Sequence, residues 1–144
     1  MLTAPEVILT QGHDRSVDFW AFGVLLFEML CRRTPFVGKN QKRTFEKIVE
    51  SQKYISFQKG FDAHGKFLLR KLLNPNPSIR LGCLRNGCND VKNHAFFSDI
   101  DFSNLVAGTE PMPYIPNPSD DITSELDVHF KVNALIFDDG GKSN

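Results

Sequence analysis

The fold is decided by residues 16–31, which read Ser16-Val-Asp-Phe-Trp-Ala-Phe-Gly-Val-Leu-Leu-Phe-Glu-Met-Leu-Cys31. Ser16 is expected to be the N-cap of a helix, because its hydroxyl can accept a hydrogen bond from a first-turn amide. Asp18 suits the positive end of the helix dipole. Between Phe19 and Cys31 the only charged residue is Glu28. A helix that is apolar on every side is a buried helix, and this one is shorter than the ~20 residues needed to span a membrane. The stretch therefore predicts the central helix of a globular core.

Composition and charge indicate one globular domain without a nucleic-acid partner. The 144 residues carry 17 acidic and 17 basic side chains and are 41% hydrophobic, which is enough apolar content for one packed core. The balanced charge gives no reason to expect a polyanion as partner, and no stretch predicts a membrane span. Three cysteines without a signal-peptide pattern indicate reduced thiols and a cytoplasmic protein. Cys83 and Cys88 lack a second pair of ligands at zinc-site spacing, so we expect no metal site.

Three further helices follow from the apolar pattern. Residues 41–51 place apolar side chains at spacings of three and four, which is typical of an amphipathic helix. Asp62 is expected to cap a helix that runs to residue 73, and Asp90 to cap a shorter one that runs to residue 96. The inward-facing residues of the helix capped by Asp62 are expected to be Phe67, Leu68, Leu72 and Leu73.

Proline and extended stretches complete the predicted architecture. Pro5 suits the first turn of a short helix, and residues 54–57 are expected to be extended. Four prolines between residues 111 and 118 exclude regular structure there. We therefore predict a mainly α fold with about four main helices, followed by an extended irregular tail.

Several short motifs occur in a fixed order along the chain. Ala4-Pro5-Glu6 is followed by Asp18-x-Trp20-x-x-Gly23, then by Pro35-Phe36, and then by Arg80 after a proline-rich break. In this order and spacing they resemble the lower part of the C-terminal lobe of a protein kinase, whose activation segment closes with Ala-Pro-Glu.

Later motifs resemble one group of protein kinases more closely. They are Arg80-Leu-Gly82, Asn86-Gly87, Asp90-Val-Lys92, His94, Phe96-Phe97 and Tyr114-Ile-Pro116. They are similar to the AGC serine/threonine kinases, particularly the cyclic-nucleotide-dependent kinases and among them the cGMP-dependent ones. The resemblance implies a partial kinase domain over residues 1–97 and an AGC C-terminal extension over residues 98–144. Within that extension, residues 137–139 and the segment around Thr123-Ser124 stay alternative matches to the adenine-approaching element of the group.

The resemblance also implies structural roles for five residues. Glu6 and Arg80 would form the ion pair that locks the activation segment to the lobe. Asp18 would accept hydrogen bonds from the catalytic loop, Trp20 would pack beneath the Ala-Pro-Glu segment, and Gly23 would permit close helix packing. The residues alone leave simpler interpretations open, since Glu6 and Arg80 could be separate surface charges and Asp18 a first-turn acid that only stabilises its helix.

Three residues are implied to contact a protein substrate. Leu2 and Thr3 fall in the loop that touches the residue after the phosphoacceptor, and Glu28 corresponds to the acid that holds an arginine upstream of it. A rim charge that touches no peptide is the alternative for Glu28.

The resemblance implies ATP and Mg²⁺ as cofactors of the parent family and a protein as its substrate. The glycine-rich loop, the strand lysine, the His-Arg-Asp loop and the Asp-Phe-Gly motif all precede Ala-Pro-Glu in that family, and here Ala-Pro-Glu begins at residue 4. Residues 13–15 and 141–143 imitate a catalytic loop and a phosphate loop in composition only, so we reject both. We expect no catalytic, ATP-binding or metal-binding residue in this chain.

Two functions follow as expectations. The first is a C-terminal piece of a serine/threonine kinase, inactive by itself, whose partner is the missing small lobe and catalytic loop. The alternative is a non-catalytic kinase-like interaction module that uses the exposed face of its central helix. A module should unfold cooperatively, whereas a severed half should be poorly soluble or molten.

Overall fold

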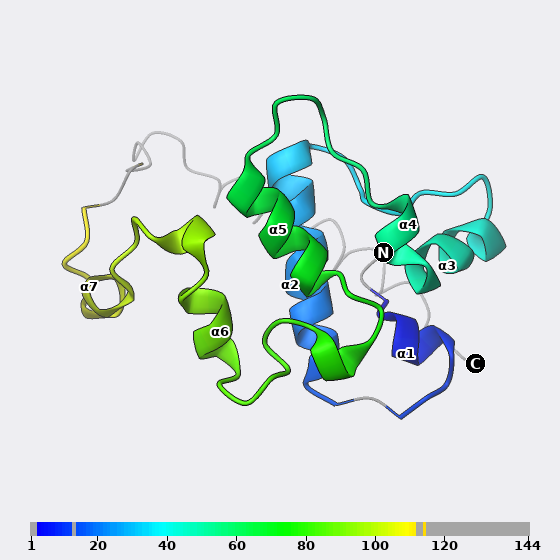
Figure 1. Ribbon diagram of the computed structural model, residues 1–144, viewed down its shortest axis with the longest axis horizontal. Helices are drawn as coiled ribbons and strands as arrows, with labels where there is room; N and C mark the ends of the chain where they lie inside the picture. The colour runs from blue at the N-terminus through cyan, green and yellow to red at the C-terminus, as the bar shows by residue number, and fades with distance from the viewer. Residues whose placement is uncertain (1–2, 13, 112–113, 115–144) are drawn as a thin grey trace, which may run out of the picture. The chain divides into compact units, whose positions relative to one another are not determined.

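The computed structural model describes residues 3–12, 14–111 and 114. The chain divides into the units Met1–Gly108 and Thr109–Asn144, and the described helices all belong to the first unit (Figure 1). Within the described ranges the regular structure is helical, without a strand, which confirms the mainly α prediction. The α-helices are α1 (Pro5–Ile8), α2 (Ser16–Cys31), α3 (Gln41–Val49), α4 (Ser51–Tyr54), α5 (Ala63–Leu72), α6 (Cys88–Lys92) and α7 (Phe102–Ala107), and two 3₁₀ turns span Pro77–Ile79 and Ala95–Phe97.

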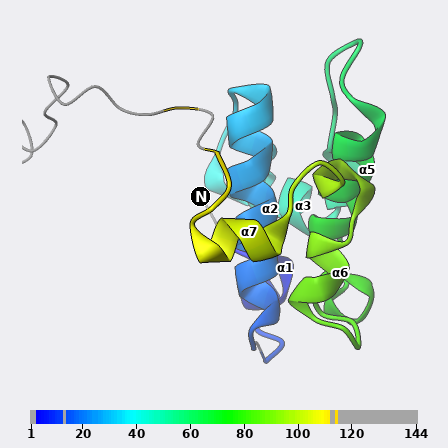
Figure 2. The ribbon, with the colours of Figure 1, turned by 90° about the vertical axis from the view of Figure 1, so that its left-hand side faces the viewer.

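Helix α2 is the centre of the fold. It packs along α5, and the two helices lie side by side in both ribbon views (Figures 1 and 2). Trp20 and Phe27 of α2 are fully buried, as are Leu68, Leu69 and Leu72 of α5. Burying side chains of this size contributes about 1.5–3 kcal/mol each, so the α2–α5 contact is the main apolar layer of the domain.

The start of α2 differs from the prediction. Ser16 is the first helical residue and does not cap the helix, because its backbone N–H donates to Asp14 Oδ1 at 2.8 Å and its hydroxyl donates to Glu6 Oε1 at 2.9 Å. A hydrogen bond from a hydroxyl to a carboxylate is charge-assisted, and it is stronger than the bond that the hydroxyl oxygen would accept from a backbone amide. The side chain therefore joins two segments of the chain.

The prediction that α2 is buried on every side is wrong for its second half. Leu25 is 51% exposed, Met29 is 59% exposed and Leu30 is 40% exposed. The second half of α2 therefore presents large apolar side chains to solvent.

The helix predicted over residues 41–51 ends earlier and is followed by a second short helix. Glu50, with φ −100° and ψ 34°, breaks the helix between α3 and α4. Ser51 is fully buried and its hydroxyl donates to the Leu73 carbonyl at 2.8 Å. Because Tyr54 belongs to α4, the extended segment predicted from residue 54 begins at Ile55.

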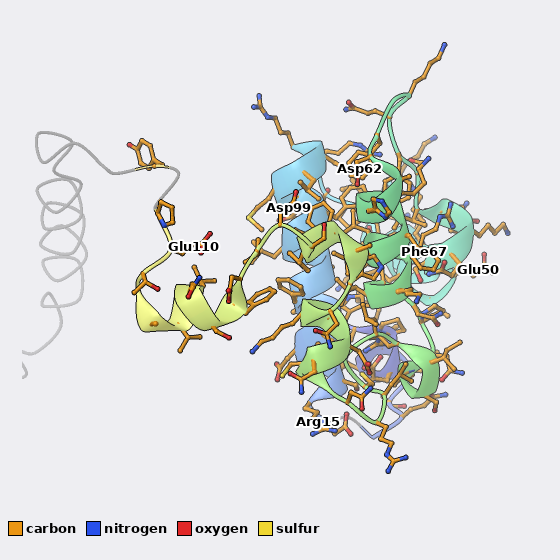
Figure 3. All side chains as sticks on the ribbon, turned by 60° about the vertical axis from the view of Figure 1, so that its left-hand side comes forward. Arg15, Glu50, Asp62, Phe67, Asp99 and Glu110 are labelled. Atoms are coloured by element: carbon orange, nitrogen blue, oxygen red, sulfur yellow. The ribbon has the colours of Figure 1, made fainter. Side chains whose placement is uncertain are left out.

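Helix α5 follows its prediction at the start and departs from it at one side chain (Figure 3). Asp62 caps the helix, since its Oδ2 accepts from the Gly65 amide. Phe67 does not face inward: it is 55% exposed, its ring centroid lies 5.6 Å from that of His94, and Lys71 Nζ lies 4.4 Å from its centre. Leu69 is buried as part of the inward face instead.

The last predicted helix is split in two. The N-cap of α6 is Gly87 at φ +59°, and Asp90 lies in the first turn, where its Oδ1 accepts from Asn86 Nδ2 at 3.0 Å. The helix ends at Lys92, and His94 caps the separate 3₁₀ turn that follows. Glycine suits position 87 because a side chain is disfavoured at positive φ.

The first part of the predicted tail is helical. Helix α7 is capped by Asp101, whose Oδ1 accepts from the amides of Ser103 and Asn104, and it ends at Ala107 with Gly108 as its C-cap. Phe102 of this helix contacts Phe97 edge-on with a centroid distance of 5.9 Å. The candidate segments around residues 123–124 and 137–139 lie outside the described residues. No helix of the described part has the length and apolarity required to cross a bilayer.

Gly23 allows α2 to approach α5 closely, and this contact generates a prediction. A Cβ at position 23 would lie 2.9 Å from Leu72 Cβ and 3.0 Å from Leu73 Cδ2, so Gly23→Ala should destabilise the fold by about 1–3 kcal/mol through overpacking, less the ~1 kcal/mol that alanine gains in a helix. Urea unfolding measures the change. Gly12→Ala is the control, because a Cβ there meets nothing within 4 Å. Equal stability of the two variants would contradict the close packing.

Candidate functional site

Helix α1 places the carboxylate of Glu6 in the interior. Ala4 is extended and precedes the helix, and Pro5 occupies its first turn, where a missing N–H costs nothing. Ala4 is 1% exposed and Glu6 is 3% exposed. A carboxylate buried to this degree needs charged or hydrogen-bonding partners.

Arg80 supplies those partners. Its Nη1 lies 2.7 Å from Glu6 Oε1 and its Nη2 lies 2.8 Å from Glu6 Oε2, so the pair is bidentate. Arg80 is fully buried. Parallel N–H···O bonds of this kind fix both distance and orientation.

The remaining donors of Arg80 bind backbone carbonyls. Its Nη1 also donates to Ser16 O at 2.8 Å, its Nε donates to Asn74 O at 2.9 Å, and its Nη2 donates to Pro75 O at 3.4 Å. A guanidinium has five N–H donors, and here five acceptors surround it. The side chain therefore joins α1, the start of α2 and the loop after α5.

Ser16 completes the hydrogen bonding of Glu6. Burial raises the pKa of Glu6, but the hydrogen bonds from Arg80, its own backbone and Ser16 outweigh that effect and lower the pKa below its ordinary value. Glu6 is therefore ionised at neutral pH. The sequence did not indicate this role, since serine before an apolar helix predicts a cap, and nothing in the pattern showed that its hydroxyl would face a distant carboxylate.

Trp20 packs against the ion pair. Its ring is fully buried, lies 5.2 Å from the Arg80 guanidinium carbon and stacks on Phe36 with centroids 5.7 Å apart. Contact between a guanidinium and an indole face is favourable, and more so away from water. Nothing in the described residues accepts a hydrogen bond from the indole Nε1.

Asp18 lies outside this cluster. It is exposed and lines an apolar pocket of about 410 Å³, together with Phe19, Phe22, Val91 and Phe97, among other residues. Within the described ranges no hydrogen bond or ion pair reaches its carboxylate. An acid beside apolar surface presents free acceptors to any chain segment that covers the pocket.

The residues expected to contact a substrate make no polar contact with one another in the described ranges. Glu28 and Thr3 are each half-buried, and in the described part of the chain no hydrogen bond or ion pair joins them. Glu28 has no salt-bridge partner among these residues. Leu2 lies outside the described residues.

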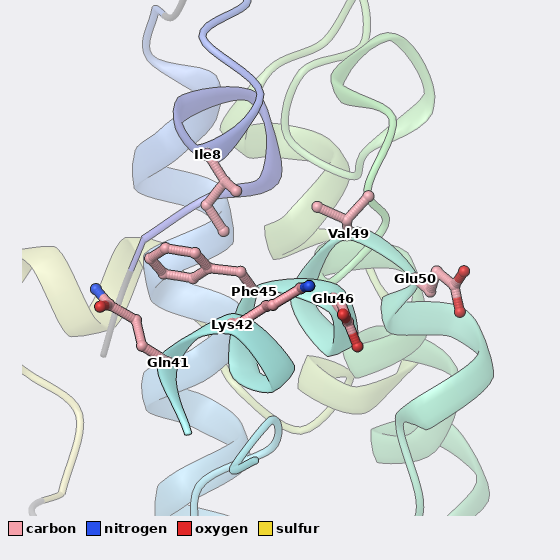
Figure 4. A pocket seen from close by; sticks show the side chains of 7 residues that line it. All are labelled: Ile8, Gln41, Lys42, Phe45, Glu46, Val49 and Glu50. Atoms are coloured by element: carbon pink, nitrogen blue, oxygen red, sulfur yellow. The ribbon is translucent and has the colours of Figure 1, made fainter. Parts of the chain in front are cut away.

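A groove separates α1 from α3. It has a volume of about 510 Å³, and Figure 4 shows Ile8 of α1 facing Phe45 of α3, with Lys42, Glu46 and Glu50 along the rim. Glu46 is already paired with Arg43 at 2.7 Å. The groove combines an apolar floor with charges of both signs.

The described residues include no cluster of side chains that could hold a metal ion. Among residues 3–12, 14–111 and 114, no three His, Cys, Asp or Glu side chains are grouped closely enough to hold a metal ion. Magnesium bound with a nucleotide is held by carboxylates and phosphates together, and this part of the chain offers no such carboxylate set.

Comparison with known proteins shows the family of the chain. Residues 2–97 match the protein kinase domain family. The chain belongs to this family. One relative is the cAMP-dependent protein kinase catalytic subunit of Dictyostelium discoideum. It is 42% identical over 113 residues, covering 78% of this chain and 17% of that protein.

Other relatives include the cGMP-dependent protein kinase 2 of Homo sapiens, which is 40% identical over 110 residues, covering 76% of this chain and 14% of that protein. The protein kinase C-like 2 of Schizosaccharomyces pombe is 35% identical over 142 residues, covering 92% of this chain and 14% of that protein. The first two matches confirm the resemblance to cyclic-nucleotide-dependent AGC kinases, with a cAMP-dependent and a cGMP-dependent enzyme at similar identity. The chain spans less than a fifth of the length of each of these three relatives.

Proposed function

We propose that this chain forms the substrate-side part of the large lobe of an AGC serine/threonine kinase. The parent protein would transfer the γ-phosphoryl group of ATP to a Ser or Thr hydroxyl of a protein substrate, with Mg²⁺ stabilising the phosphate charge when bound. The observation that supports this most strongly is the buried bidentate pair of Glu6 and Arg80, which joins the Ala-Pro-Glu segment to the helical core.

The proposed role of the pair is mechanical. A buried carboxylate and guanidinium that are held by several hydrogen bonds fix the end of the activation segment against α2 and the loop after α5. Trp20 would pack beneath the Ala-Pro-Glu segment, and Gly23 would permit close helix packing. Asp18 would accept hydrogen bonds from the catalytic loop. Phosphoryl transfer depends on positioning. A rigid support for the catalytic loop would therefore assist the reaction without contacting the reacting groups.

The proposed substrate contacts are Glu28, Thr3 and Leu2. A half-buried carboxylate without a salt-bridge partner among the described residues can bind the guanidinium of a basic peptide. The substrate class is therefore a protein segment with arginine or lysine before the phosphoacceptor. We also propose that the kinase acts in the cytoplasm, in line with the free cysteines Cys31, Cys83 and Cys88.

The proposed domain boundary lies after residue 97, with an AGC extension from residue 98 onward. Helix α7 would then be the first element of the extension, packed back on Phe97 through Phe102. The first compact unit continues to Gly108.

A second candidate function is an interaction module that lacks catalysis. The exposed Leu25, Met29 and Leu30 on α2 favour it, because such a face binds a partner or associates. In the kinase proposal, the same face is covered by other parts of the kinase domain. A cooperative thermal transition of the 144-residue chain alone would favour the module.

The kinase proposal predicts that the 144-residue chain does not bind nucleotide by itself. The sequence contains no glycine-rich phosphate loop and the described residues offer no metal-binding group, so titration with Mg²⁺-ATP in a calorimeter should give no binding heat at micromolar concentrations. Micromolar affinity would contradict the proposal that this chain lacks the ATP site.

The proposed substrate contact predicts a selective loss of activity in the proposed parent kinase. Glu28→Gln should lower kcat/KM for a peptide with arginine upstream of the phosphoacceptor by roughly 10- to 100-fold, since a charged hydrogen bond contributes about 1.5–3 kcal/mol. The same variant should leave an alanine-substituted peptide unaffected. Glu50→Gln is the control, because its carboxylate pairs with Lys53 at 3.2 Å on the surface. Equal losses on both peptides would contradict a direct contact.

A further inference from the structure

Ser56 is presented to solvent between two anchored neighbours. Ile55 is 4% exposed and extended, with φ −64° and ψ 120°, and Phe57 is half-buried. Ser56 itself is exposed, and the residues from 55 to 58 form neither helix nor strand. An exposed hydroxyl on a non-helical segment is accessible to an enzyme that binds its substrate in an extended form.

Arg33, which lies just after the C-terminal end of α2, forms hydrogen bonds with this serine. Its Nη2 donates to the Ser56 carbonyl at 2.7 Å and to the Ser56 Oγ at 3.2 Å. The hydroxyl therefore already lies against a guanidinium. A phosphate on Oγ would bring its oxygens within reach of the same group, and guanidinium–phosphate pairs are among the stronger charged hydrogen bonds.

Two further cations lie near the ring of Phe57, the residue that follows Ser56. The Arg33 guanidinium lies 5.1 Å from the centre of the Phe27 ring, while Lys66 and Arg70 lie 5.8 Å and 5.7 Å from the centre of Phe57. The two rings are themselves 5.9 Å apart. In the described ranges none of the three cations forms a salt bridge, so no carboxylate oxygen lies within 4.0 Å of their charged nitrogens.

The acids that precede and follow Ser56 in the sequence are already engaged. Glu50 pairs with Lys53, and Asp62 accepts the Gly65 amide at the start of α5. Lys53 also stands three residues before Ser56, so the segment carries a basic side chain upstream of the hydroxyl.

We propose that Ser56 is a phosphorylation site whose phosphate is bound by Arg33, within the positive surface that Lys66 and Arg70 extend. Ser56 Oγ bonds to the γ-phosphorus of ATP as the bond from that phosphorus to the β,γ-bridging oxygen breaks. The hydroxyl proton passes to the base of the modifying kinase and ADP leaves. The phosphate ties the end of α2 to the segment before α5, and this inference does not depend on the proposed function of the chain.

The first test is modification. The full chain is incubated with Mg²⁺-ATP and a basic-directed serine/threonine kinase, and phosphopeptides are mapped by mass spectrometry. Ser56 should be modified faster than Ser98, an exposed serine whose hydroxyl donates to Asp99 at 3.1 Å. The proposal is overturned if Ser56 carries no phosphate, whether or not Ser98 is modified.

The second test measures the contact with Arg33. Phosphoserine is incorporated at position 56 during synthesis, and its second pKa, ordinarily about 6, is followed by ³¹P NMR. Binding to Arg33 should lower that pKa by roughly half a unit or more, which corresponds to a threefold or larger preference of the dianion for the site. In Arg33→Gln the shift should vanish, and in Arg33→Lys it should be reduced.

The matched control is phosphoserine at position 98, where Asp99 should raise the second pKa. Near-UV circular dichroism verifies folding in each sample. The proposal is overturned if the pKa at position 56 is equal in the parent chain and in Arg33→Gln. It is also overturned if phosphate at position 56 unfolds the chain, because the native site must accept it.

Discussion

The bidentate ion pair of Glu6 and Arg80 joins residues that are 74 positions apart in the sequence. Taking both charges out of water costs several kcal/mol per ion, and only good geometry with satisfied hydrogen bonds offsets that cost. Here the guanidinium has five acceptors and the carboxylate gains a serine hydroxyl. The two parallel hydrogen bonds fix where α1 lies against the core. Removing one partner would leave a buried, uncompensated charge.

Helix α2 gives this pair its setting because its two faces differ. One face buries Trp20 and Phe27 against α5 and Phe36, and Gly23 allows the close approach. The other face exposes Leu25 and Met29 and, near the start of the helix, the carboxylate of Asp18 beside an apolar pocket. One helix therefore carries the anchor of the Ala-Pro-Glu segment and an open apolar surface. In the proposed kinase, the first face would hold the Ala-Pro-Glu segment and the second would be covered by other parts of the kinase domain.

The sequence predicted the elements well where local rules decide them. Pro5, Asp62 and the break at residues 74–77 place helix ends through backbone chemistry that is independent of distant contacts. It failed where a tertiary partner intervened: Ser16 donates to Glu6 instead of capping, and Phe67 meets His94 at the surface. The approach of Glu6 to Arg80 came from motif resemblance, since no periodicity relates residues so far apart. The carbonyls of Asn74 and Pro75 that complete the site belong to the backbone and leave no signature in side-chain pattern.

A double-mutant cycle on the ion pair tests most directly whether Glu6 and Arg80 hold the first segment on the core. Glu6→Gln, Arg80→Met and the double variant are compared with the parent chain by urea unfolding, and the interaction free energy is the departure from additivity. We predict a coupling of about 2–3 kcal/mol, with the double variant more stable than the sum of the single losses implies, because each single change strands a buried polar partner. A coupling within about 0.5 kcal/mol of zero, as for exposed or independent charges, would contradict that role for the pair.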